Sequence, residues 1–505
     1  MTTSITSKSP FGECFELVID EQREEERLKQ VAEATTRPMV VIQGLGFVGA
    51  AMCAAVASAE RHSGQPRFHV VGVDLADQRN AWKIARVNEG LSPVISTDEQ
   101  MVKAYAKAHE QRNLTATYLE QVYEIADVVV VDVNLDIHKS GLGKVDDYRF
   151  GYDAYERALT SVALRTKEDC LILIETTVPP GTTEKVVKPL FERIYRQRGL
   201  DPSKLLLAHS YERVMPGPDY LNSVTNYYRV FSGVNEASTV AARQFLESFI
   251  NTADFPLQEL HSTNASEMSK VLENTFRATN IALIREWTEF AHAAKVNLFE
   301  VIEAIRVRPT HKNIMAPGFG VGGYCLTKDA LLADYAYKSH FGGEATLNMS
   351  LNAIAVNDVM PETTMKLLEP WLSDVATPKL ALLGISYLND VSDTRYTPAY
   401  YFTDLAEKEG CTVIHHDPLV EYWEERNSSV HTDLRHESFE SCQVVVLAVR
   451  HRQYLDLSAD DIRRAFPALQ ILVDANNIIS DEIARNLHED DVRVLGVGKG
   501  HWLAW

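Results

Sequence analysis

The sequence is poor in the residues that mark several classes of protein. Only six of its 505 residues are cysteines and no two form a C-x-x-C pair, which argues against a disulfide framework or a zinc knuckle and for a reducing compartment. Basic residues are in deficit, because 50 Lys and Arg stand against 70 Asp and Glu and give a formal net charge of −20. This surplus of acid disfavours nucleic acid and anionic membrane surfaces as partners.

Long hydrophobic runs are also scarce. The first 37 residues carry charges from Lys8 to Arg37 without an apolar core, so we expect a helical or frayed extension, neither a signal peptide nor an anchor. Residues Met39–Ala59 are uncharged and nearly long enough to span a bilayer, but glycines and Gln43 interrupt them. A buried strand, a glycine turn and an apolar helix explain this run better. We therefore expect a cytoplasmic protein.

What the sequence does contain is the alternation of an α/β protein. Buried β-rich runs separated by amphipathic stretches predict a parallel, doubly wound sheet. Long helices are expected over Ala265–Lys295 and Thr346–Leu372, on either side of the glycine-rich loop Pro317–Gly323. After Thr377-Pro378 a second alternation begins. The expected strands are Met39–Gln43, Phe68–Asp74, Asp127–Val133, Cys170–Glu175 and Lys204–Ala208, then Leu380–Gly384, Thr412–His416, Cys442–Ala448, Ile471–Asp474 and Arg493–Val497.

The glycine motif Gly44-Leu-Gly46-Phe47-Val48-Gly49 lies between the first predicted strand and an apolar helix. Its glycines would permit a tight turn, a close approach of the backbone to a pyrophosphate and close packing of helix on strand. Asp74 ends the second predicted strand, where a ribose hydroxyl would lie, and a carboxylate there favours NAD over NADP. An ordinary strand–turn–helix is the alternative.

Five further groups of residues indicate chemistry, and most of them have a plainer alternative. Cys325 follows the glycine loop and precedes Asp329 by four residues, which suggests a nucleophile with an acid/base partner or else a buried apolar cysteine. Lys270 and Asn274 share a helix face and could stabilise an oxyanion, or simply be solvated. Glu212 lies past a predicted strand end and could be a general base, or pair with Arg213 on the surface.

The remaining groups also follow predicted strands. Glu175-Thr-Thr177-Val-Pro-Pro-Gly-Thr-Thr183 lies past the strand that ends near Glu175, where α/β sheets place ligands. Asp393-Thr-Arg395 follows the first strand of the second sheet. Its arginine could bind a phosphate or carboxylate bidentately, and a salt bridge with Asp393 is the alternative.

In this order, the motifs resemble the UDP-glucose/GDP-mannose dehydrogenase family, over Pro38 to about Gly500. The resemblance implies two Rossmann-like parallel-sheet domains joined by a central helical dimerisation domain. It also implies NAD-dependent, four-electron oxidation of the C6 alcohol of a nucleotide sugar to the uronate, for polysaccharide precursors. The implied boundaries are an extension (1–37), an NAD domain (38–259), a central domain (260–374) and a nucleotide-sugar domain (375–505).

The resemblance also implies residue roles. Cys325 would form a thiohemiacetal and then a thioester, Lys270 and Asn274 would stabilise oxyanions, and Asp329, Glu212 and Thr177 would serve proton transfer and the hydrolytic water. Cofactor contacts are implied for Gly44, Gly46, Phe47, Val48, Gly49, Asp74, Arg79, Thr177 and Arg395. Substrate contacts are implied for Glu212, Arg213, Lys270, Asn274, Arg308 and Gly322.

The sugar is less defined than the reaction. Asn274–Leu283, Val356–Pro361 and the glycine loop resemble the branch that oxidises UDP-N-acetylhexosamines, whereas Cys325–Asp329 is more similar to the UDP-glucose and GDP-mannose branches. Leu388 stands where the family usually has a substrate-binding lysine, and Tyr211 replaces a proline. Two alternatives stay open. One is a two-electron β-hydroxyacid-type NAD dehydrogenase, which also joins an NAD sheet to a helical domain with a catalytic lysine. The other, supported only by these departures, is a non-catalytic protein that binds NAD and nucleotide.

No metal requirement is expected. His415 and His416 are adjacent on a predicted strand, where neighbouring side chains point to opposite faces and do not readily bind one metal ion. The expected partners are a nucleotide sugar and a second copy of the chain, as a homodimer or a higher homo-oligomer.

Overall fold

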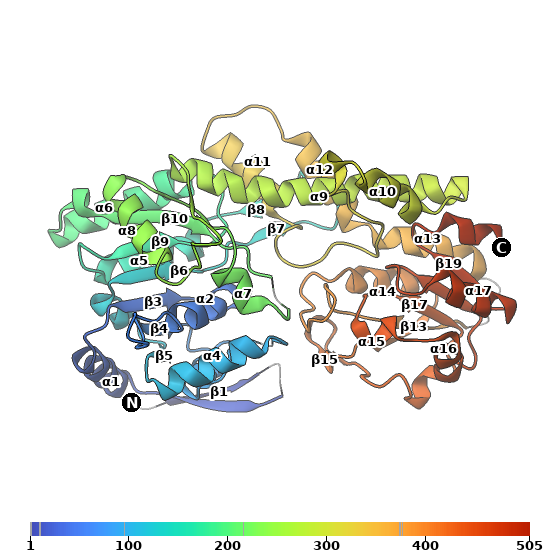
Figure 1. Cartoon of the computed structure of the whole chain (residues 1–505), viewed down its shortest axis with the longest axis horizontal. Coiled ribbons are helices and arrows are strands. Elements are labelled where there is room, and N and C mark those ends of the chain that lie inside the picture. Colours follow the sequence, from blue (N-terminus) through green and yellow to red (C-terminus); the bar gives the residue numbers. More distant parts are fainter. Residues whose placement is uncertain (1–2, 10–11, 95, 216, 373–374, 376) are drawn as a thin grey trace. The chain divides into compact units, whose positions relative to one another are not determined.

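The computed structural model describes residues 3–9, 12–94, 96–215, 217–372, 375 and 377–505. The chain folds into two compact units (Figure 1). The first comprises Met1–Ile137, Phe150–Val271 and Tyr335–Ala345, and the second His138–Arg149, Leu272–Asp334 and Thr346–Trp505. The expected domain boundary at residue 374 lies outside the described residues.

The first unit is built on an eight-stranded sheet of order β12-β11-β10-β9-β6-β3-β4-β5. Its strands pair in parallel except for β10 and β11, so the expected all-parallel sheet has one antiparallel step. The strands are β3 (Met39–Gln43), β4 (His69–Val73), β5 (Leu114–Thr117), β6 (Val128–Val131), β9 (Leu171–Ile174), β10 (Leu206–Tyr211), β11 (Val230–Gly233) and β12 (Gln258–Glu259).

Helices cover both faces of this sheet because alternate strand residues point to opposite sides. Val40 and Ile42 pack in one core with the apolar α2, and Val41 packs in the other with residues of α5 and α6. The helices are α1 (Glu21–Ala34), α2 (Phe47–Ala57), α3 (Ala81–Asn88), α4 (Glu99–Glu110), α5 (Asp153–Arg165), α6 (Lys188–Arg198), α7 (Tyr220–Thr225) and α8 (Glu236–Leu246).

The N-terminal extension is only partly helical. Before α1, β1 (Thr3–Lys8) and β2 (Cys14–Ile19) form an antiparallel hairpin that packs on α3, which corrects the expectation of a helical or frayed segment. The alternating exposure of β2 is the strand signal that the sequence analysis missed. Arg27 on α1 donates to the Ala116 carbonyl at 3.0 Å, so the extension covers the edge strand β5.

The second unit contains a five-stranded, wholly parallel sheet of order β14-β13-β17-β18-β19. Its strands are β13 (Lys379–Leu383), β14 (Thr412–His416), β17 (Val444–Leu447), β18 (Ile471–Asp474) and β19 (Arg493–Gly496). Its helices are α10 (Leu298–Arg306), α12 (Asn348–Asp358), α13 (Pro361–Leu372), α14 (Pro398–Lys408), α15 (Arg452–Leu455), α16 (Ala459–Ala465) and α17 (Asp481–Glu489). The expected pair of α/β folds is thus confirmed.

Two helices run from one unit into the other along the chain: α9 (Thr263–Ala294) and α11 (Asp329–Ser339). The helix expected over Thr346–Leu372 is divided into α12 and α13, because Pro361 lacks the N–H that would continue α12. The small strands are β7 (Ile137–Lys139), β8 (Tyr148–Phe150), β15 (Tyr422–Trp423) and β16 (Ser428–Ser429).

The uncharged stretch Met39–Ala59 forms β3, the glycine turn and α2, as expected. Among the described residues, no helix combines the length and the apolar character needed to cross a bilayer.

Candidate active site

The glycine turn between β3 and α2 has the geometry of a dinucleotide site. Gly44 has a φ of +101°, and a Cβ there would lie 2.8 Å from the Asp132 carbonyl oxygen. A Cβ on Gly49 would lie 1.8 Å from the Gly44 oxygen, so this glycine permits close packing. Gly46, at the N-terminus of α2, faces open space. The three glycines therefore fit a pyrophosphate at the helix N-terminus.

The carboxylate of Asp74 lies at the end of β4 and binds this turn. It accepts hydrogen bonds from the backbone N–H groups of Leu45 at 3.0 Å and Leu75 at 2.8 Å, and Lys83 Nζ lies 3.5 Å away. The side chain is largely covered, with 11% exposed. Arg79, in contrast, is exposed. Its backbone N–H donates to the Asp77 carboxylate, and its carbonyl accepts from the Trp82 indole N–H.

The predicted Lys270 and Glu212 come together in the first unit. Both side chains are buried. Lys270 Nζ donates to the Glu212 carbonyl at 2.8 Å and lies 3.6 Å from Glu212 Oε1. The Val214 N–H donates to Glu212 Oε2. This holds the carboxylate beside the ammonium, in a site whose low dielectric strengthens the attraction.

Tyr211, which replaces a proline of the family, takes part in this arrangement. Its hydroxyl is 2.9 Å from Ser269 Oγ on α9, and Arg213 Nη2 donates to it at 3.1 Å. Arg213 also donates to the Tyr228 carbonyl at 2.7 Å. The tyrosine thus ties the end of β10 to the helix that carries Lys270. Pro216 of the same motif lies outside the described residues.

Two acids behind Glu212 were not recognised as a group from the sequence. Glu175 follows β9 and is paired with the buried Arg229, whereas Asp132 follows β6 and has both carboxyl oxygens buried. Burial raises the pKa of Glu175 to about 7 against the opposing effect of Arg229. Burial and then the neighbouring Glu175 and Glu212 raise the pKa of Asp132. Asp132 gave no sequence signal because no motif contains it.

The Thr-Val-Pro-Pro-Gly-Thr-Thr loop is anchored to α9. The buried Glu267 carboxylate accepts from the Gly181 N–H at 2.6 Å, the Thr183 N–H at 2.8 Å and the Thr183 hydroxyl at 2.6 Å. These donors lie at the start of the π-helical turn η2 (Thr183–Val187). Thr177 lies half-buried earlier in the same loop.

In the second unit, Asn274 and Asp329 are brought into contact, which the sequence analysis did not predict. Asn274 Nδ2 donates to Asp329 Oδ2 at 2.6 Å. The Asp329 N–H in turn donates to the Cys325 carbonyl at 3.0 Å, so the acid begins α11 one turn after the cysteine. Cys325 is exposed, which excludes the alternative of a buried apolar cysteine.

The cysteine loop rests on the loop that carries Arg395. The Gly323 N–H donates to the Arg395 carbonyl at 3.2 Å, and a Cβ on Gly322 would lie 2.7 Å from Tyr387 Cβ. Arg395 forms the salt bridge with Asp393 that the sequence analysis gave as the alternative to ligand binding, with 2.7 Å between Nη2 and Oδ2. Its side chain is still 44% exposed. Arg308 is exposed at the start of a 3₁₀ turn, Pro309–His311.

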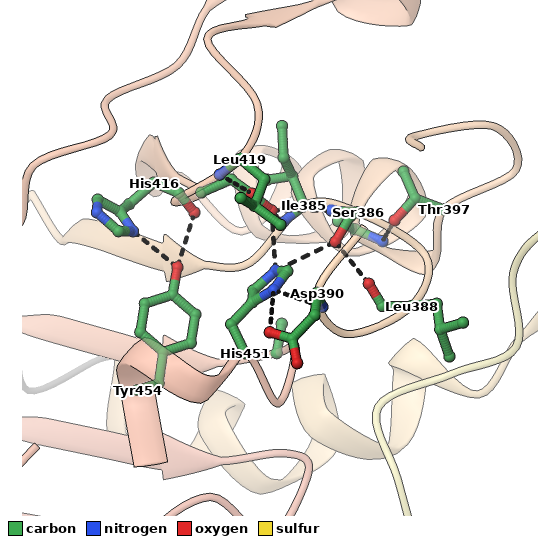
Figure 2. Close-up of polar contacts among 12 residues, drawn as sticks. Ile385, Ser386, Leu388, Asp390, Thr397, His416, Leu419, His451 and Tyr454 are labelled. Atoms are coloured by element: carbon green, nitrogen blue, oxygen red, sulfur yellow. Dashed lines mark hydrogen bonds and ion pairs between the residues drawn. The ribbon is translucent and has the colours of Figure 1, made fainter. Parts of the chain in front are cut away.

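A buried polar network fixes the loop after β13 (Figure 2). The Ile385 and Ser386 N–H groups donate to Asp417 Oδ2 at 2.9 and 3.1 Å. His451 Nε2 lies 3.3 Å from that oxygen and 3.1 Å from Ser386 Oγ. The Asp390 N–H donates to His451 Nδ1 at 2.9 Å, so the ring proton is on Nε2 and the histidine is not a base for Ser386.

Leu388 belongs to this loop. Its carbonyl accepts from the Ser386 hydroxyl at 2.9 Å, and its side chain is 41% exposed. The network therefore holds the backbone at the position where the family usually has a lysine.

His415 and His416 have different partners. His416 Nδ1 lies 2.7 Å from the Tyr454 hydroxyl (Figure 2), and His415 Nε2 lies 3.1 Å from Thr403 Oγ1. No group of three or more His, Cys, Asp or Glu residues in the described part of the chain is arranged to hold a metal ion.

The chain is similar to known proteins over most of its length. Sequence models of the UDP-glucose/GDP-mannose dehydrogenase family match residues 38–250 as the NAD binding domain, 264–358 as the central domain and 381–481 as the UDP binding domain. A UDP-N-acetyl-D-mannosamine dehydrogenase of Pyrococcus horikoshii is 30% identical over 446 residues, covering 88% of this chain and 96% of that protein.

Two further comparisons agree with this. A protein of the same name from Methanocaldococcus jannaschii is 28% identical over 468 residues, covering 91% of this chain and 97% of that one. The solved structure of UDP-D-ManNAc dehydrogenase from Pyrococcus horikoshii superposes with a TM-score of 0.77 at 27% identity, covering 92% of this chain and 100% of that chain.

Proposed function

Because the chain belongs to the UDP-glucose/GDP-mannose dehydrogenase family, we propose that it oxidises a nucleotide sugar at C6 by four electrons, to the uronate. It is an NAD-dependent oxidoreductase. The observation that supports the four-electron reaction most directly is the exposed Cys325, followed one turn later by Asp329 in contact with Asn274. A two-electron dehydrogenase has no use for this nucleophile.

The first unit would hold NAD through Gly44, Gly46, Phe47, Val48 and Gly49, with Asp74 toward the ribose. When bound, NAD supplies the acceptor for the hydrides that leave C6. Thr177, Arg79 and Arg395 are proposed as further contacts with the cofactor. The open surface over Gly46 supports a pyrophosphate at this turn.

The chain's own residues perform the remaining chemistry. Cys325 Sγ adds to the C6 aldehyde left by the first oxidation, and the resulting thiohemiacetal is oxidised to a thioester. Lys270 and Asn274 donate to the oxygen on C6, which bears negative charge as each tetrahedral species forms or collapses. Glu212 takes a proton from the water that attacks the thioester, and Cys325 leaves as a thiolate. Asp329 and Thr177 hold the water and its proton.

The covalent step has a physical advantage. An aldehyde bound to sulfur does not escape or hydrate, and the oxidation is divided into steps of smaller barrier. Arg213, Arg308 and Gly322 are proposed to contact the nucleotide sugar.

Among nucleotide sugars, a UDP-N-acetylhexosamine is the proposed substrate class. The family's UDP binding domain matches residues 381–481, and both curated relatives described above are named UDP-N-acetyl-D-mannosamine dehydrogenases. In this proposal the second Rossmann-like fold, from residue 375, binds the nucleotide, while residues 38–259 bind NAD and 260–374 form the central domain.

A homodimer is proposed as the working form. Large apolar side chains lie on one stripe of α9 at helical spacing, at Leu272, Phe276, Leu283, Trp287 and Phe290, and each is between 48% and 63% exposed. An exposed apolar stripe of this kind is costly to leave in water and fits a second copy of the same helix.

The test is the number of NADH molecules formed per nucleotide sugar consumed. Purified protein is given UDP-N-acetylglucosamine, UDP-N-acetylmannosamine, UDP-glucose or GDP-mannose with excess NAD. Two NADH per sugar on one compound establishes the four-electron oxidation and identifies the substrate. One NADH per sugar indicates a two-electron dehydrogenase, and none on any compound contradicts the proposal for this panel.

A further inference from the structure

Three carboxyl groups and the cationic groups of an arginine and a lysine are buried together at one edge of the sheet of the first unit. Asp132 follows β6, Glu175 follows β9 and Glu212 follows β10. Arg229 Nη2 donates to Glu175 Oε1, and Lys270 Nζ lies 3.6 Å from Glu212 Oε1. Three carboxylates against two cations would leave one uncompensated negative charge in a site of low dielectric, which is strongly unfavourable.

The geometry indicates where that charge is neutralised. No N–H or O–H group of the described residues donates to either carboxyl oxygen of Asp132 or to Glu175 Oε2, although all three atoms are buried. Asp132 and Glu175 directly follow Val131 and Ile174, which are paired residues of the neighbouring strands β6 and β9, so the two acids lie side by side at the end of the sheet. Two neighbouring buried carboxylates do not both ionise near neutral pH, because their charges repel.

The other groups that face the pair do not supply a positive charge. Burial, with Lys270 and Arg229 nearby, lowers the pKa of His209 on β10 to about 3, so this histidine is neutral. Burial also raises the pKa of the Cys53 thiol on α2 and of the Tyr155 phenol on α5, and both stay uncharged. Arg229 and Lys270 are thus the cations that pair with acids of the cluster.

We propose that Asp132 and Glu175 share one proton in the folded protein. The pair then carries one negative charge, and Glu212, beside Lys270, carries the other. Asp132 and Glu175 thus bind a proton close to Glu212, the proposed general base. Asp132 is accordingly a positioning residue that acts through Glu175 and does not touch the substrate. This inference rests on the proposed function only for the role of Glu212.

The raised pKa values of both carboxyls agree with a shared proton and fix the sign of its effect on stability. The folded state keeps a proton that the unfolded chain releases above about pH 4. The equilibrium between folded and unfolded protein therefore shifts toward unfolding as the pH rises, by up to about tenfold per pH unit until the pair ionises.

The experiment compares Asp132→Asn with wild type. An asparagine amide has the shape of the protonated acid and donates to Glu175 Oε2 without titrating. Melting temperatures are measured between about pH 5 and pH 8. The melting temperature of the variant relative to wild type is expected to rise steadily with pH. The exposed Asp136, on the same loop, gives the matched control Asp136→Asn, whose difference from wild type is expected to be constant.

Infrared spectroscopy provides a second measurement that does not depend on unfolding. The spectrum of wild type minus Asp132→Asn at neutral pH is expected to contain a band of a protonated carboxyl group, and wild type minus Asp136→Asn is not. A melting difference that stays constant with pH, or the absence of that band, would overturn the shared proton. If Asp132→Asn does not fold, Asp132→Ala replaces it in both measurements, with the same sign of pH dependence.

Turnover tests the link with Glu212. Loss of the shared proton at alkaline pH adds a further negative charge to the cluster near Lys270 and the oxygen on C6, whereas Asp132→Asn has no such proton to lose. The alkaline limb of the pH profile of kcat is therefore expected to move to higher pH in Asp132→Asn and to stay in place in Asp136→Asn. An unmoved limb overturns the link between the pair and the proposed active site. If wild type oxidises no sugar of the panel, the proposed function fails, whereas the melting and infrared results still decide the shared proton.

Discussion

At the scale of single residues, Cys325 provides the sharpest test of the proposed chemistry. A serine hydroxyl is a far weaker nucleophile than a thiolate, so Cys325→Ser is expected to lower uronate formation by a factor of at least about 1,000. Binding of the nucleotide sugar, measured by calorimetry, should be preserved. Cys14→Ser is the matched control, because Cys14 is also exposed but lies on β2. Full activity of Cys325→Ser would exclude the thioester mechanism.

Leu388 gives a gain-of-function test at the same scale. The buried network around His451 holds the loop backbone, so an exposed lysine at this position should extend as the leucine does. If a substrate phosphate lies near, Leu388→Lys is expected to lower KM for the nucleotide sugar about tenfold, through a charge-assisted contact, with kcat little changed. Added salt should weaken this gain. Leu388→Met is the neutral control, and equal KM values in both variants would contradict a phosphate at this site.

At the scale of elements, α9 organises the first unit as well as carrying Lys270. Glu267 joins it to the loop before α6 through three hydrogen bonds. Burial raises the pKa of this carboxyl to about 7 against those hydrogen bonds. Because the folded pKa lies above the unfolded one, the carboxyl's contribution to stability is complete at acid pH and is lost as the pH rises toward 7.

The variant Glu267→Gln does not titrate, so its stability deficit is expected to be largest near pH 4.5 and to shrink by about 3 kcal/mol by pH 7. Thermal melting of both proteins at several pH values measures this difference. Glu286→Gln, at an exposed position of the same helix, is the matched control, and its difference from wild type is expected not to shrink in this way. A deficit of Glu267→Gln that grows with pH would contradict the assigned direction.

The N-terminal hairpin and α1 show why elements at a sheet edge matter. Strand β5 is the last strand of the sheet, and an unpaired edge is a template for pairing with another chain. Arg27 bonds to the Ala116 carbonyl, and the Tyr118 hydroxyl accepts from the Asp20 N–H at 2.9 Å. The extension thus protects the NAD-binding sheet without contributing a proposed catalytic group.

At the scale of the whole molecule, the prediction concerns assembly. The apolar stripe of α9 is proposed to be covered by a second copy, so a charge in its middle should be incompatible with the dimer. Light scattering is expected to give about twice the chain mass of 56.6 kDa for wild type and about one chain mass for Trp287→Glu. Leu164→Glu, on α5, is the control, since Leu164 is 49% exposed away from this stripe. A wild-type monomer would contradict the proposal.

The local features of this protein were determined by the sequence itself. The strands Met39–Gln43, Thr412–His416 and Ile471–Asp474 form with the expected bounds. The first and the last are buried and largely apolar, as strands inside a parallel sheet are. The glycine turn was also anticipated, since the spacing of its glycines predicts a tight turn between strand and helix. The family followed from the order of these motifs.

Only the tertiary structure decided which distant residues became neighbours. Arg229 and Glu175 are separated by 54 residues, and Asp132 belongs to no motif, so nothing in the local pattern places them together. The pairing of β1 with β2 and the position of His451 beside Asp417 are likewise set by packing. Periodicity reports which face of an element is buried, whereas the partners of a buried charge depend on how the strands are ordered in the sheet, and that order is a property of the folded chain.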